Sequence, residues 1–154
     1  MASNVPIIQT TPWGEDRAVY PAIYKDFETG RTWEAFSSHP QIDSGLGFTC
    51  DHGVLAMIQA LHHAGLPTLY SCESVGPWVI RRKEVCFSHA KPHALLDCCL
   101  FLQATKLEDF DLKIRVDNYC KPPNIHATLS YSLHIENELL NALNSVKWHT
   151  TYGL

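Results

Sequence analysis

Two segments of the chain alternate strictly between apolar and polar residues, which predicts two strands with one apolar and one polar face each. The first has apolar residues at Phe110, Leu112, Ile114 and Val116, between polar Asp111, Lys113, Arg115 and Asp117. The second follows a turn at 121–124 and has apolar Ile125, Ala127, Leu129, Tyr131 and Leu133 between His126, Thr128, Ser130, Ser132 and His134. Because strands of an all-parallel sheet are apolar on both faces, this pattern favours an antiparallel or mixed sheet.

Three other segments repeat apolar residues at helical spacing, and we expect helices over about residues 52–64, from Pro92 onward, and over 136–147. Asp51 is a typical N-terminal cap for the first helix, and Gly65 suits the left-handed position after its end. His62 and His63 would meet the negative end of that helix dipole. The expected buried positions are Val54, Leu55, Ile58 and Leu61, then Leu95, Leu96, Cys99 and Leu102, and finally Leu139, Leu140, Leu143 and Val146.

The remaining pattern predicts a hairpin over residues 19–36 and two strands, at 68–70 and within 78–88. Residues 1–18 are expected to be an irregular arm, and 37–49 a loop. The order after the hairpin is then α-β-β-α-β-β-α over residues 50–148, within a single domain of residues 1–154. We predict an α+β sandwich, whose mainly antiparallel or mixed sheet carries about three helices on one face.

The composition fits one globular domain and narrows the classes of partner. The chain has 154 residues, 45% apolar and 18% charged, with a net charge of −4. Duplex nucleic acid is not an expected partner, because domains that bind it are usually basic. No apolar segment approaches the roughly 20 residues that cross a bilayer, and the N-terminus lacks a signal-peptide pattern. We expect a cytoplasmic protein without a membrane partner, whose six cysteines are reduced thiols.

Reactive residue types gather in two segments, Cys50-Asp51-His52-Gly53 and Ser71-Cys72-Glu73-Ser74. The first opens a predicted helix, and the second ends a predicted strand that returns toward the helix start. A helix N-terminus offers free N–H groups and partial positive charge, which can hold an anion or lower the pKa of a cysteine. We take Asp51, Gly53 and residues 71–74 as candidate ligand-binding residues. The alternative is structural, with Asp51 as a cap and Cys72 as a small buried residue.

Residues 50–105 resemble a set of small uncharacterised bacterial and phage proteins. Their pattern is Asp-x-Gly, a Leu-rich helix, then Gly-x-x-Thr-x-x-Ser-Cys-x-Gly, which falls here on 51–53 and 65–74. Ser74 stands where the pattern has its last glycine, so the backbone of that turn would differ. The resemblance implies a prokaryotic or phage setting and supports a site around Asp51 and Cys72. It implies no particular reaction.

The polar face of the two alternating strands is a further candidate for binding. If the strands are neighbours, Lys113 and Arg115 lie beside His126, Thr128 and Ser130, which makes a surface of donors suited to phosphates or ribose hydroxyls. An ordinary solvated strand face is the alternative. The His126–Thr128 segment is also similar to one half of the His-x-Thr pair of two-histidine phosphoesterases. The other candidate half, at 149–151, follows too closely for that duplication.

Cys86, His89 and His93 have spacings that occur among zinc ligands. A fourth ligand would have to come from a distant segment, and Pro92 separates His89 from a helix that could present both histidines. We therefore expect no metal and no other cofactor, and keep this set as the weaker alternative.

These residues favour a small ligand-binding protein of phage or bacterial origin, with a pocket for an anionic, nucleotide-like molecule. In a phage, such a protein could intercept a nucleotide immune signal. The alternative is a hydrolase or transferase, including a phosphodiesterase-like enzyme, with Cys72 as nucleophile, His52 or His126 as base, and Asp51 orienting the base. A protein-interaction module is the third hypothesis. The sequence does not decide whether the protein is an enzyme or only binds a ligand, and it is compatible with a homo-oligomer.

Overall fold

The computed structural model describes residues 5–27, 29–68, 70–75, 82–88, 92–117 and 124–145; for 70–75, 87–88, 92–94, 116–117 and 124–126 it describes the backbone only. The strands are β1 (Ile7–Thr10), β2 (Asp16–Lys25), β3 (Thr32–Ser37), β4 (Gln41–Asp43), β5 (Thr49–Asp51), β6 (Tyr70–Val75), β7 (Arg82–Ser88), β8 (Phe110–Asp117) and β9 (Asn124–Ser132). The helices are α1 (Leu55–His63), α2 (Pro92–Thr105) and α3 (Glu136–Ser145), and the 3₁₀ turns η1 (His52–Val54) and η2 (Leu133–Ile135) precede α1 and α3.

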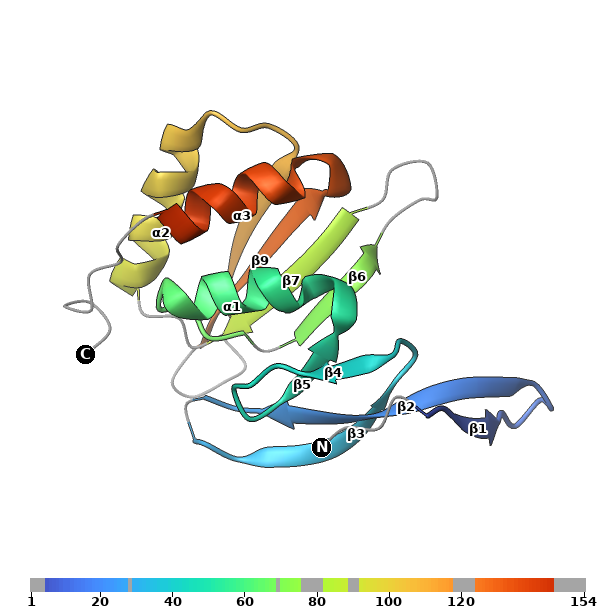
Figure 1. The fold of residues 1–154 in the computed structure, drawn as a ribbon. Coiled ribbons are helices and arrows are strands. Elements are labelled where there is room, and N and C mark those ends of the chain that lie inside the picture. The colour runs from blue at the N-terminus through green and yellow to red at the C-terminus, as the bar shows by residue number, and fades with distance from the viewer. Residues whose placement is uncertain are drawn as a thin grey trace.

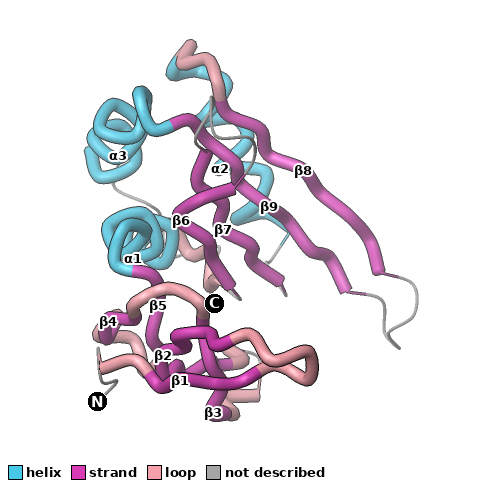
Figure 2. Tube along the Cα trace, turned by 90° about the vertical axis from the view of Figure 1, so that its right-hand side faces the viewer, coloured by secondary structure: helices cyan, strands magenta, loops and turns pink. Residues whose placement is uncertain are grey.

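The fold is α+β, as the sequence pattern predicts. The largest sheet has the strand order β6-β7-β9-β8 and is antiparallel throughout. The three helices cover one face of this sheet, and strands β1–β5 form two smaller sheets beneath α1 (Figures 1 and 2). Among the described residues, no helix is long and apolar enough to span a membrane.

The core lies between the four-stranded sheet and its helices. Val85 on β7 and Leu112 on β8 both pair with Leu129 on β9, so these side chains share the covered face. The helical residues buried against them include Val54, Met57, Ile58, Leu61, Leu95, Cys98, Leu102, Leu139 and Leu143. Burying each large apolar side chain contributes about 1.5–3 kcal/mol, so this contact holds the helices on the sheet.

The end of α1 follows the sequence prediction, and its start does not. Gly65 has a φ of +82°. The Leu66 N–H donates to the Leu61 carbonyl (2.9 Å) and the Gly65 N–H to the His62 carbonyl (3.0 Å). These two bonds form a Schellman motif, which favours glycine at the left-handed position. At the other end, η1 occupies the first expected turn and α1 begins at Leu55.

The N-terminal third of the chain is more regular than the sequence predicts. The expected hairpin is present as β2 and β3, but the expected arm contains β1, which pairs Ile7 with Val19. The expected loop at 37–49 contains the β4–β5 hairpin. Gln41 holds that hairpin together, because its amide bonds both Thr49 Oγ1 (3.0 Å) and Asp51 Oδ1 (2.7 Å). Side-chain bonds of this kind leave no periodic pattern in a sequence.

Two further expectations are corrected. β6 begins at Tyr70 and continues to Val75, through the residues expected to form a turn. In α2, Leu96 is 59% exposed and Cys98 takes the buried place expected of Cys99. Leu95, Cys98 and Leu102 share one face of the helix, and Leu96 lies outside that face. The expected buried Val146 lies outside the described residues.

His62 is not the exposed dipole partner that its place near the end of α1 predicts. Its ring centroid lies 4.8 Å from that of Phe27 and 5.7 Å from that of Phe48. Its Nε2 accepts a hydrogen bond from the Thr68 N–H (3.0 Å). Burial, with a smaller effect of the Lys25 charge, lowers the pKa of His62 to about 4, so the ring is neutral at pH 7.

The pH dependence of stability should reveal this partly buried ring. The unfolded chain protonates His62 near pH 6.5 and the folded chain only near pH 4, so stability should fall as the pH decreases across that interval. His62→Gln keeps a neutral acceptor for the Thr68 N–H and should flatten this part of the profile. Urea unfolding at pH 7 and pH 5 measures the effect, with exposed His63→Gln as control. An equal loss in all three proteins would contradict the assignment.

Candidate functional site

The face of the four-stranded sheet turned away from the helices is polar. Lys113 on β8 pairs with Thr128 on β9, and Arg82 on β7 pairs with Ser132 on β9, so the register places these side chains on one face. We call this surface the open face. Its described side chains are Arg82, Glu84, Cys86, Asp111, Lys113, Arg115, Thr128, Ser130 and Ser132, of which Cys86 and Ser132 are buried.

Arg82 is fixed across β9 on the open face. Its Nε donates to Ser130 Oγ (2.9 Å), its Nη1 to Ser132 Oγ (3.3 Å), and its Nη2 to the Ser130 carbonyl (3.0 Å). These bonds hold the plane of the guanidinium and leave part of its five-donor fork for other acceptors. A guanidinium held in this way is a preorganised donor for a phosphate or carboxylate.

The structure brings together the open-face residues that the sequence predicts. Lys113 and Arg115 are exposed on β8, and Thr128 and Ser130 are partly buried on β9. In the register, Arg115 lies opposite His126, for which only the backbone is described. Arg82 on β7 joins these residues on the same face, where it lies opposite Ser132.

The segment Asp51–Gly53 lies on the other side of the sheet. β6 contacts β5 and η1, so the strand that carries residues 71–74 does return to the helix start. However, the Lys83 side chain, which faces the helices, donates from its Nζ to the Gly53 carbonyl (2.5 Å). The sheet therefore separates Gly53 from Lys113, so the helix start and the open face do not form one pocket.

Residues 71–74 are placed by their backbone alone. In the register, Ser71 lies opposite Val85 and Cys72 lies opposite Glu84. Glu73 and Ser74 fall where the register between β6 and β7 shifts, before Val75 pairs with Arg82. An irregular ladder at this point agrees with the turn-rich composition of the segment.

Asp51 does not cap the helix. It is 4% exposed, makes no side-chain cap hydrogen bond, and accepts from Gln41 Nε2 at 2.7 Å. The Asp51 carboxylate therefore links β5 to β4. The backbone of Asp51 is extended, because this residue is the last of β5 and η1 begins after it. His52, the neighbouring candidate base, is exposed in η1.

A buried ion pair that the sequence analysis missed lies on the covered face. Lys83 is 8% exposed, and its Nζ lies 2.6 Å from Glu136 Oε2 in the first turn of α3. Tyr131, opposite Lys83 in the register, has a buried hydroxyl that faces the same Glu136 carboxylate. Burial and the Glu136 charge raise the pKa of Tyr131. The sequence did carry a signal, because Lys83 precedes the core residue Val85 by two positions in a strand.

Cys50, Cys98 and Cys99 are not activated nucleophiles. Burial raises the pKa of Cys50 and of Cys98 to about 12 and also raises the pKa of Cys99, so these thiols stay protonated at neutral pH. For Cys72, the nucleophile of the enzyme hypothesis, only the backbone is described.

The structure describes only some of the residues proposed to bind zinc. Cys86 is buried in β7, His93 lies in the first turn of α2, and His89 falls outside the described residues. Within the described ranges, no three histidine, cysteine, aspartate or glutamate side chains gather as a metal site would require.

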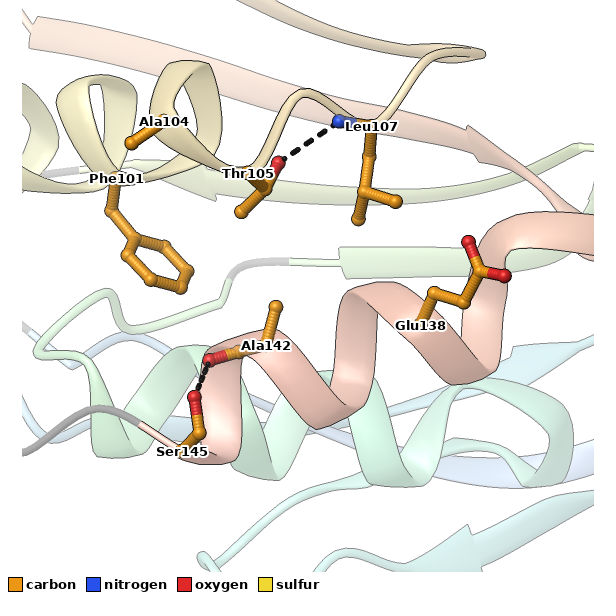
Figure 3. Close-up of a pocket in the computed structure, with 7 residues that line it drawn as sticks. All are labelled: Phe101, Ala104, Thr105, Leu107, Glu138, Ala142 and Ser145. Carbon is orange, nitrogen blue, oxygen red and sulfur yellow. Dashed lines mark hydrogen bonds between the residues drawn. The ribbon is translucent and has the colours of Figure 1, made fainter.

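A groove of about 310 Å³ runs between α2 and α3 (Figure 3). Its lining residues are Phe101, Ala104, Thr105, Leu107, Glu138, Ala142 and Ser145. Two of its polar atoms are occupied within the chain, because Thr105 Oγ1 donates to the Leu102 carbonyl and Ser145 Oγ to the Ala142 carbonyl. With Glu138 as its one charged residue, this groove does not suit an anionic ligand.

No protein-family model, curated protein or solved structure shows significant similarity to this chain. The resemblance to small bacterial and phage proteins therefore stays a prediction. The functional argument rests on the geometry of the open face.

Replacement of Asp51 tests its structural role. Asp51→Ala should lower the free energy of unfolding by about 1–3 kcal/mol, because the Gln41 amide loses a buried charged acceptor. Asp51→Asn keeps an acceptor oxygen and should lose less. Urea unfolding measures both, with exposed Glu15→Ala as control. If Asp51→Ala is no less stable than the control, its bond to Gln41 does not support the fold.

Proposed function

We propose that the protein binds a small anionic molecule of the nucleotide class on the open face. The observation that carries this proposal is the Arg82 guanidinium, held by Ser130 and Ser132 on a face that also presents Lys113. A fixed guanidinium gives directional bonds to a phosphate, and a nearby lysine adds charge without constraining geometry.

The charges of the open face also favour such a ligand. The register places the cations Arg82, Lys113 and Arg115 on this face together with the acidic Glu84, Asp111 and Asp117, so the face carries mixed charge. The cations can bond a phosphate, while the carboxylates and hydroxyls can bond the hydroxyls of a sugar. A nucleotide offers both groups, which inorganic phosphate does not.

Binding measurements with charge deletions test this proposal. Lys113→Ala and Arg115→Ala should each weaken binding of ATP or a cyclic dinucleotide by about five- to tenfold, since each removes an exposed charge-assisted contact. Both side chains are exposed, so stability should change little. Isothermal titration calorimetry at low salt measures the affinities, with adenosine as the uncharged ligand.

Arg17→Ala, an exposed arginine on β2, is the matched control and should bind like the wild type. Equal affinity for adenosine and ATP would contradict a phosphate site. An effect of Arg17→Ala as large as that of Lys113→Ala would contradict its placement on the open face.

A second candidate function, docking of another protein, is favoured by a different observation. Ile8, Trp13, Trp33 and Phe36 are exposed by 47% to 70% on β1, β3 and the turn after β1. Figure 1 shows the β1–β2 hairpin extending away from the helices. Large exposed apolar side chains of this kind mark protein interaction surfaces. A protein that only docks would bind none of the phosphorylated ligands above.

A further inference from the structure

One edge of the four-stranded sheet is shaped to receive another strand. Among the described strands, the order β6-β7-β9-β8 leaves β6 and β8 at the edges. β6 lies against β5 and η1, whereas β8 forms the outer margin of the sheet (Figure 2). An edge strand presents main-chain N–H and C=O groups that can pair with a further strand.

The bonds between β8 and β9 determine which groups point outward. The Ser132 N–H donates to the Asp109 carbonyl at 3.0 Å, so every second residue from Asp109 onward directs its main-chain groups to β9. The residues between them direct their N–H and C=O groups to the free edge. Those residues are Phe110, Leu112, Ile114 and Val116.

A second copy of β8 fits this edge when it runs antiparallel. If Leu112 lies opposite the partner's Leu112, the outward groups of both strands meet and can exchange hydrogen bonds. In the same register, Asp111 lies opposite the partner's Lys113, and Phe110 lies opposite the partner's Ile114. Twofold symmetry repeats each pair. Opposite charges therefore face each other on the open face of the junction, and apolar side chains contact each other on the covered face.

The charges of β8 select this register over its neighbours. Only shifts by an even number of residues keep the apolar side chains on the covered face. One such shift puts Lys113 opposite the partner's Lys113, and the other puts Asp111 opposite the partner's Asp111. The first shift also places Asp111 opposite the partner's Arg115, but it adds the like pair of lysines, and like charges directly opposed are destabilising. The register centred on Leu112 is therefore favoured over both shifts.

An exposed apolar side chain lies at the same edge on the covered face. Ile114 on β8 pairs with the buried Ala127, and it is 51% exposed. A continued sheet would therefore cover apolar surface that the single chain leaves exposed.

We propose that two copies of this chain associate through β8 as a symmetric dimer with one continuous sheet. The pairing needs no ligand, because it uses main-chain groups and side chains of the protein alone. Lys113 takes part in both proposals, so dimerisation is measured without ligand. The proposal identifies the partner at this edge as the chain itself.

Exchange of the two charged residues tests the proposal. Asp111→Lys and Lys113→Asp each place like charges opposite each other twice per dimer and should weaken dimerisation about tenfold or more. The double variant D111K/K113D restores opposite charges and should dimerise within about threefold of the wild type. Sedimentation equilibrium of the full chain without ligand measures the dissociation constants.

Glu34→Lys, a charge reversal on exposed β3, is the control and should leave the dimer unchanged. All variants alter exposed side chains, so thermal melting should show an intact fold in each. A wild-type chain that stays monomeric up to about 1 mM overturns the proposal. A dimer that neither single exchange weakens also overturns it, because the contact then lies elsewhere.

Discussion

One buried ammonium group connects the parts of this fold. Lys83 lies in the inner strand β7, and its Nζ reaches both the Gly53 carbonyl before α1 and the Glu136 carboxylate in α3. A buried charge is tolerated only when it is paired and hydrogen-bonded. The starts of α1 and α3 are therefore fixed relative to the sheet by the same atom. Figure 1 shows that both helices begin at the same end of the sheet.

The alternation of β7 gives two adjacent cations different roles. Lys83 points to the helices and bonds the Gly53 carbonyl and the Glu136 carboxylate. Arg82 points to the open face and keeps N–H donors for other acceptors. Asp51 is likewise engaged with Gln41 on the structural side. The sheet thus separates groups that hold the fold from groups that can meet a ligand, which is why the proposed function rests on the open face.

Periodic features were predictable from the sequence, and features held by single non-local bonds were not. The strands β8 and β9 and the end of α1 follow from alternation and from Gly65, which act locally. The β4–β5 hairpin depends on the Gln41 amide, and the burial of Lys83 depends on Glu136, more than 50 residues away. The sequence analysis also predicted that Asp51–Gly53 and Lys113 line one pocket. The structure places them on opposite sides of the sheet, and no sequence pattern indicates on which side of a sheet a helix packs.

A double-mutant cycle on Lys83 and Glu136 tests the central claim most directly. Lys83→Met and Glu136→Gln each remove one partner and should each lower the free energy of urea unfolding by about 3 kcal/mol. The double variant leaves no unpaired charge, so its loss should be smaller than the sum of the two by about 2 kcal/mol. Losses that add to within about 0.5 kcal/mol would contradict the account, because the two residues would then act independently.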